Sequence, residues 1–273
     1  DGFTITGGNA SENFSNDDRG KGAGLWADSA AFTVSNCKFV SNNSYQGGSA
    51  IYIKEGNSTF SNCEFTSNTT TSTGTGAAVY LEDTNVTFIG SSFLNNHAQY
   101  HGGAIKSENS EINLISCSLV ANRSLVSNGG GAIYISGGNY SILSSSFDSN
   151  QATFQGGAIL VSNASGIIED SNFTANQNTS SNGGGALYLD NTSPTIVRCQ
   201  FIENTTSANN YGGAIKLNNS SPSISDSSFL RNHSLANSGG AIYIDSSSNP
   251  SFSKNEFQLN SAAQFGGAIF VNG

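Results

Sequence analysis

Short stretches of alternating apolar and polar residues recur along this chain in a constant frame. Each copy opens on a Gly-Gly-Ala-Ile type segment, reaches a large apolar residue about fifteen positions after the Ala, and places an Asn three positions later. The frame returns every 26 to 28 residues. The apolar position is Phe39, Phe65, Phe93, Leu119, Phe147, Phe173, Phe201, Phe229 and Phe257. The Asn position is Asn42, Asn68, Asn96, Asn122, Asn150, Asn176, Asn204, Asn232 and Asn260.

Within each copy the alternation has a period of two, which is typical of β-strands, and it predicts three short strands per copy. The first strand turns residues such as Ile51 and Ile53 inward. The second carries a large apolar residue five positions before the Phe, such as Phe60. The third ends at the Phe, with a small residue such as Cys63 two positions earlier on the same face. These inward-facing residues recur in every copy, so they predict a thin core lined by a few positions per copy.

A repeat of this length without helical periodicity is typical of a solenoid, in which each unit buries its face against its neighbours. Parallel strands stacked about 4.8 Å apart pair their backbone groups with the units before and after. The sequence therefore predicts an all-β fold, a parallel β-helix of about ten coils, in one domain over residues 1–273. The repeat is under way at both ends, so we expect a segment of a longer chain.

The Asn and Gly positions predict tight corners. Asn tolerates left-handed backbone angles at a turn, and its amide can donate to and accept from the Asn of adjacent coils. We therefore expect the Asn and Phe ladders to be buried. The glycines before the Ala predict a corner that needs a positive φ or a close backbone approach.

The variation in length is concentrated in one loop. The distance from the Asn to the next Ala ranges from eight to ten residues, whereas the distance from the Ala to the Phe is nearly constant. Segments such as 69–72, 123–126, 178–181 and 207–210 should then line one edge of the solenoid. Such an edge is either a partner-binding surface or a place where insertions are tolerated cheaply.

Composition bears on partners and compartment. Only 11% of residues are charged, and ten basic against nineteen acidic residues give a net charge of −9, which opposes binding to nucleic acid. No stretch is long and apolar enough for membrane insertion. The chain holds many Asn-x-Ser/Thr sequons, as expected of an extracellular or cell-surface glycoprotein. The acceptors expected in the loop after the first strand are Asn57, Asn85, Asn139, Asn163, Asn191 and Asn218. Sequons at ladder Asn residues should be too buried for modification.

The two motifs together resemble the passenger repeats of the polymorphic outer membrane proteins first known from chlamydiae. The match rests on Gly-Gly-Ala-Ile at 102–105 and 239–242 combined with Phe-x-x-Asn at 65–68 and 173–176. This resemblance implies a right-handed parallel β-helix displayed on a cell surface and used in adhesion. The autotransporter barrel of that family has no counterpart in this sequence.

Parallel β-helices also house polysaccharide lyases and hydrolases, whose sites need clustered carboxylates beside a base. The acidic pairs here are Asp17–Asp18, Glu82–Asp83 and Glu169–Asp170. We expect the side chains of Glu169 and Asp170 to point to opposite sides of a strand. The three histidines and four cysteines lack the spacing of a metal site. Cys37 and Cys63 stack close enough for a disulfide, although buried free thiols are expected. The sequence predicts no catalytic site, metal or cofactor.

The outward side of the first strand is the candidate binding surface. It predicts an exposed strip of aromatic rings, which would stack on sugars, pack against another protein, or only stabilise the sheet by cross-strand pairing. The strip consists of Trp26, Tyr52, Tyr80, Tyr134, Tyr188 and Tyr243. The predicted function is non-enzymatic and structural (a fibre or appendage) or adhesive, with a surface glycan or a protein as partner, including self-assembly. The alternative is a carbohydrate-active or carbohydrate-binding β-helix of the lyase type.

Overall fold

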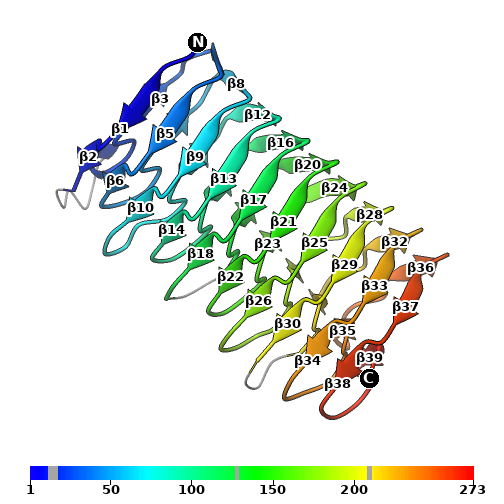
Figure 1. Ribbon diagram of the computed structural model, residues 1–273. Coiled ribbons are helices and arrows are strands. Elements are labelled where there is room, and N and C mark those ends of the chain that lie inside the picture. Colours follow the sequence, from blue (N-terminus) through cyan, green and yellow to red (C-terminus); the bar gives the residue numbers. More distant parts are fainter. Residues whose placement is uncertain (12–17, 127–128, 208–210) are drawn as a thin grey trace.

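The computed structural model describes residues 1–11, 18–126, 129–207 and 211–273. Its strands form four parallel sheets that run along one right-handed solenoid (Figure 1). The strands that the structure describes make nine complete coils, with β1 and β2 before them and β39 after them. The predicted all-β fold of about ten coils is confirmed. The one helical element in the described ranges is the short 3-10 turn η1 (Asp18–Gly20).

The first sheet, which follows the Gly-Gly-Ala corner, contains ten strands. They are β3 (Leu25–Asp28), β7 (Ile51–Lys54), β11 (Val79–Glu82), β15 (Ile105–Glu108), β19 (Ile133–Ser136), β23 (Ile159–Ser162), β27 (Leu187–Asp190), β31 (Ile215–Asn218), β35 (Ile242–Ile244) and β39 (Ile269–Val271). The second sheet contains nine. They are β4 (Phe32–Ser35), β8 (Asn57–Ser61), β12 (Asn85–Ile89), β16 (Glu111–Ile115), β20 (Asn139–Leu143), β24 (Ser165–Glu169), β28 (Thr195–Val197), β32 (Ser223–Ser225) and β36 (Ser251–Ser253).

The third sheet carries the Phe ladder. Its strands are β1 (Thr4–Thr6), β5 (Lys38–Val40), β9 (Glu64–Thr66), β13 (Ser92–Leu94), β17 (Ser118–Val120), β21 (Ser146–Asp148), β25 (Asn172–Thr174), β29 (Gln200–Ile202), β33 (Ser228–Leu230) and β37 (Glu256–Gln258). The fourth sheet follows the Asn ladder. Its strands are β2 (Asn9–Ala10), β6 (Asn43–Ser44), β10 (Thr69–Thr70), β14 (His97–Ala98), β18 (Arg123–Ser124), β22 (Gln151–Ala152), β26 (Gln177–Asn178), β30 (Thr205–Thr206), β34 (His233–Ser234) and β38 (Ser261–Ala262).

The fourth sheet corrects the prediction of three strands per coil. Its strands are two residues long, too short to show an alternating pattern in the sequence. They exist because they pair with the same positions of the neighbouring coils, as Thr69 does with Asn43 and His97.

The Phe ladder is the centre of the core. Rings in adjacent coils are nearly parallel, with centroids 4.6 Å apart for Phe65 and Phe93 and 4.8 Å apart for Phe147 and Phe173. The ladder rings from Phe39 to Phe229 are fully buried, which confirms the inward assignment, whereas Phe257 in the last coil is half-buried.

The Asn ladder is a continuous chain of hydrogen bonds inside the coil. The Oδ1 of Asn150 accepts from the backbone N–H and the Nδ2 of Asn122, both at 3.0 Å. Its Nδ2 donates to Leu119 O at 2.9 Å and to Asn176 Oδ1 at 3.0 Å. The predicted burial is confirmed from Asn42 to Asn232, and Asn260 is half-buried.

The left-handed residue at this corner is not the ladder Asn. It is the residue before it, such as Ser149 with φ 55° or Ala175 with φ 52°. The ladder Asn is thus selected by its amide rather than by its backbone freedom. At the other corner the two glycines divide the predicted roles: Gly102 has φ 61°, whereas a Cβ on Gly103 would lie 2.0 Å from the carbonyl oxygen of Gly131.

Candidate functional site

The predicted aromatic strip lies on the outer side of the first sheet, but most of it is covered. Tyr52, Tyr80, Tyr188 and Tyr243 are buried and Tyr134 is half-buried, whereas Trp26 is 48% exposed. The prediction of an exposed aromatic surface is therefore wrong for most of the strip.

The loops before the first sheet cover these rings. The loop that varies in length runs from the fourth sheet back to the Gly-Gly corner, and its residues lie over the outer face. The His101 ring is 4.5 Å from the Tyr134 ring, and the Tyr211 ring is 4.5 Å from the Tyr243 ring. Alternation in a strand tells which side a residue faces, but not whether a loop folds over that side.

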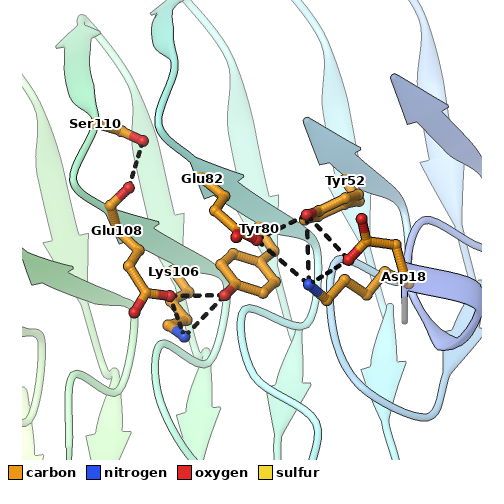
Figure 2. A network of polar contacts seen from close by, with 8 residues as sticks. Asp18, Tyr52, Tyr80, Glu82, Lys106, Glu108 and Ser110 are labelled. Carbon is orange, nitrogen blue, oxygen red and sulfur yellow. Dashed lines mark hydrogen bonds and ion pairs between the residues drawn. The ribbon is translucent and has the colours of Figure 1, made fainter. Parts of the chain in front are cut away.

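Under these loops, tyrosines and carboxylates of successive coils form a polar network (Figure 2). Tyr52 on β7 donates its hydroxyl to Glu82 Oε2 on β11 at 2.7 Å. Tyr80 on β11 donates to Glu108 Oε2 on β15, also at 2.7 Å. Each bond joins a Tyr to the acid two positions further along the strand of the next coil, so the same contact occurs in two successive coils.

Two lysines complete the network. Lys21 Nζ lies 2.8 Å from Asp18 Oδ1 and 3.3 Å from Glu82 Oε2, and it sits 4.5 Å from the centre of the Tyr52 ring. Lys106 Nζ lies 2.8 Å from Glu108 Oε2 and 4.4 Å from the centre of the Tyr80 ring. Ion pairing and cation–π contacts act on the same ammonium groups. Those of Lys21 fasten its loop to the first sheet, whereas those of Lys106 join the neighbouring strands β11 and β15.

The protonation states of these groups follow from their surroundings. Burial raises the pKa of Tyr52 and of Tyr80 above the ordinary range, and the acceptors Glu82 and Glu108 raise it further. Burial also acts to raise the pKa of Glu108, but hydrogen bonds from Lys106 and Tyr80 outweigh it and leave that pKa lowered. The phenols thus remain neutral donors and Glu108 remains an ionised acceptor. A general acid or base at neutral pH needs the opposite shifts.

A hollow of about 470 Å³ opens beside this network. Loops of successive coils form its rim, held together by parallel bridges from Gly47 to Lys21 and to Thr75. Its lining is Lys21, Tyr45, Gln46, Thr73, Thr75, Tyr80 and Lys106. Aromatic surface beside hydroxyl, amide and ammonium groups suits a ligand with apolar faces and many hydroxyls.

Of the residues that line this hollow, only Tyr80 was singled out from the sequence. The loop residues Tyr45 and Thr73 come from segments in which apolar and polar residues do not alternate regularly. The one available signal was Lys106 followed two positions later by Glu108, since i and i+2 face the same side of a strand.

The other candidate acids form ion pairs or lie apart. Arg198 binds both Glu169 and Asp170, its Nε lying 2.7 Å from Asp170 Oδ1. The expectation that these two acids point apart is wrong, because β24 ends at Glu169 and Asp170 has a left-handed φ of 49°. Asp17 lies outside the described residues.

The cysteines and histidines form no cluster in the ranges described. All four cysteines are free and buried, so Cys37 and Cys63 form no disulfide. Burial raises the pKa of the Cys117 and Cys199 thiols to about 11. Among the described residues, no group of three or more His, Cys, Asp or Glu side chains is placed to hold a metal ion.

The predicted glycan acceptors lie on the outer surface, but several are not in the loop expected of them. Asn57, Asn85 and Asn139 begin second-sheet strands, because pairing extends to these residues. Asn163 and Asn191 lie at the corner between the first two sheets, and Asn191 Nδ2 donates to Asn163 Oδ1.

Two of the acceptors are only half-exposed, Asn85 and Asn218. Asn218 ends β31, and its Nδ2 donates to Asp190 Oδ1 at 2.6 Å. The nitrogen that would carry a glycan on Asn218 is therefore already bound.

Comparison with known proteins agrees with the fold. The family model described as the right handed beta helix region matches residues 77–257. No curated protein matches the chain. The described residues contain no helix long and apolar enough to cross a membrane. The family match spans well over half of the chain and overlaps the Phe and Asn ladders, so this chain belongs to the right-handed β-helix family.

Proposed function

We propose that this chain is a non-enzymatic β-helix displayed outside the cell, and that it adheres to a surface glycan through the hollow lined by Tyr45, Tyr80 and Lys106. The observation that carries the proposal is the combination of ring surface with fixed donors in the hollow, next to a network in which the pKa of Tyr80 is raised and that of Glu108 is lowered. A sugar presents apolar ring faces and hydroxyls, and such a lining complements both.

Surface display is supported by two features of the sequence. The paired Gly-Gly-Ala-Ile and Phe-x-x-Asn motifs resemble repeats of cell-surface passengers, and four predicted glycan acceptors are exposed: Asn57, Asn139, Asn163 and Asn191. A net charge of −9 also disfavours nucleic acid as the partner.

The non-enzymatic part rests on the chemistry of the network. Cleavage of a polysaccharide requires a group that takes up a proton and one that gives it away. Near the hollow, Tyr80 is held protonated and Glu108 is held ionised by its lysine. Both groups are thereby suited to binding rather than to proton transfer.

The test is glycan binding by matched loop variants. The wild-type chain is screened against an array of oligosaccharides, and the best ligand is then titrated by calorimetry. Tyr45→Ala removes a half-buried ring from the rim and should weaken binding about tenfold, as expected for one lost aromatic contact. Tyr100→Ala removes a half-buried loop ring that does not line the hollow, and it should leave the affinity unchanged.

Three outcomes would contradict the proposal. Equal effects of the two substitutions would place binding elsewhere. Self-association without glycan binding would favour the structural alternative, in which the partner is a protein. Release of new reducing ends or unsaturated products from a bound polysaccharide would favour the lyase-like enzyme.

A further inference from the structure

Lys216 occupies the same outward column as Lys106, but its surroundings differ. Both lie at the second position of a first-sheet strand, between tyrosine-bearing neighbours. Two positions further along the strand, Lys106 has Glu108, whereas Lys216 has Asn218. Lys106 forms an ion pair with Glu108 at 2.8 Å, whereas Lys216 forms no ion pair with any of the described residues.

Three tyrosine rings enclose the Lys216 ammonium. Its Nζ lies 5.4 Å from the centre of Tyr188 on β27, 5.6 Å from Tyr243 on β35, and 5.3 Å from Tyr211 in the covering loop. The corresponding distance from Lys106 to Tyr80 is 4.4 Å. The Lys216 amine therefore lies farther from each of its three rings than the Lys106 amine lies from Tyr80.

Asp190 and Asp245, in the coils before and after Asn218, already accept hydrogen bonds from other donors. Asp190, one coil before Asn218, accepts from Asn218 Nδ2 at 2.6 Å. Asp245, one coil after, accepts from the backbone N–H of Asn219 at 3.1 Å and from Ser248. Neither carboxylate forms an ion pair with Lys216 among the described residues, although the charge of Asp245 still acts on its amine.

We propose that Lys216 is a nucleophilic amine that captures small aldehydes as imines within the cage formed by Tyr188, Tyr211 and Tyr243. The Nζ lone pair attacks the carbonyl carbon and a C–N bond forms. After proton transfer from nitrogen to oxygen, the carbonyl oxygen leaves as water and the C=N bond remains. No electrons are gained or lost, and the aldehyde is the sole co-reactant.

Burial supplies the free amine that this step needs. Burial lowers the pKa of Lys216 to about 8, and Asp245 opposes the shift only in part. At neutral pH roughly a tenth of the amine is then unprotonated, against fewer than about one in a thousand for an ordinary lysine. The three rings leave Lys216 half-buried and so limit the access of water that would hydrolyse the imine.

The test compares lysines within one molecule. The intact chain is incubated with glycolaldehyde at pH 7, imines are trapped with cyanoborohydride, and the sites are quantified by peptide mass spectrometry. Lys216 should be labelled at least about tenfold faster than Lys106 and than the exposed Lys254, since its free-amine fraction is about a hundredfold that of an ordinary lysine and a less basic amine is a somewhat weaker nucleophile. The rate at Lys216 should rise with pH to a half-maximum near pH 8.

Two variants exchange the environments of the lysines. Asn218→Glu places an acid where Glu108 stands beside Lys106, and labelling of Lys216 should fall toward the rate of Lys106. Glu108→Gln removes that acid, and labelling of Lys106 should rise several-fold. The proposal is overturned if Lys216 in the wild-type chain reacts no faster than Lys254. This comparison requires no variant to fold, and it is independent of glycan binding at the hollow.

Discussion

At the scale of single residues, the core is organised by one amide per coil. A ladder Asn uses both of its N–H groups and both lone pairs of its Oδ1, so the buried polar column leaves no amide group of Asn150 unpaired. A buried donor without a partner costs about 1 to 3 kcal/mol, which explains why one residue type holds this position in every complete coil.

Replacing Asn150 tests this column. Asn150→Ala leaves the backbone N–H of Asn122 and the carbonyl of Leu119 without their partners. The free energy of unfolding should fall by about 3 kcal/mol, measured from urea titrations. Asn113→Ala, on the outer side of the second sheet, is the control and should change it by less than about 0.5 kcal/mol. Equal losses in the two variants would mean that the ladder amides contribute no special stability.

At the scale of elements, strands could be predicted and loops could not. The ladders repeat in register with the coil, so the motif marks the same position in nine coils, eight times as Phe-x-x-Asn and once with Leu119 in place of Phe. The loops differ in length and composition from coil to coil, and their contacts reach residues of another coil, as Lys21 does to Glu82. The sequence therefore showed which side of the first sheet faces outward, but not that loops cover it.

His101 tests the loop that covers Tyr134. Burial lowers the pKa of His101 to about 4, and Lys106 adds to this. The folded chain then binds fewer protons than the unfolded chain between pH 6.5 and 4. The stabilising effect of neutral His101 is present above pH 6.5 and is lost as the pH falls toward 4.

The corresponding variant is His101→Phe, which keeps a ring against Tyr134 and removes the titration. Between pH 7 and 4 it should lose about 1 to 2 kcal/mol less stability than the wild-type chain, measured by urea unfolding at each pH. An identical pH dependence in the two proteins would show that the loop does not bury this side chain in solution.

At the scale of the whole molecule, the solenoid has a closed, repetitive interior and an outer surface whose side chains and loops differ from coil to coil. The interior repeats too regularly to form a distinctive site, so specific chemistry is left to the outer sides and the loops. The parallel stacking was predictable from the repeat and the right-handed β-helix from the resemblance of its motifs, whereas the hollow depends on loops of three coils meeting above one sheet.

Glycan occupancy distinguishes the interior from the surface. When the chain is secreted from a eukaryotic host, Asn57 and Asn139 should be modified, since their side chains are exposed. Asn68 and Asn204 should not be, because both are fully buried within the ladder. Site mapping by mass spectrometry decides the matter, and a glycan on Asn68 or Asn204 would contradict the burial of the ladder.

The most direct measurement of the adhesive function is a crystal structure of the chain with the oligosaccharide that it binds best. The structure should show an intact sugar in the hollow, with one ring face against Tyr45 and its hydroxyls within hydrogen-bond distance of Thr73 or Lys106. A sugar bound on another face, or a cleaved product in the hollow, would contradict the account.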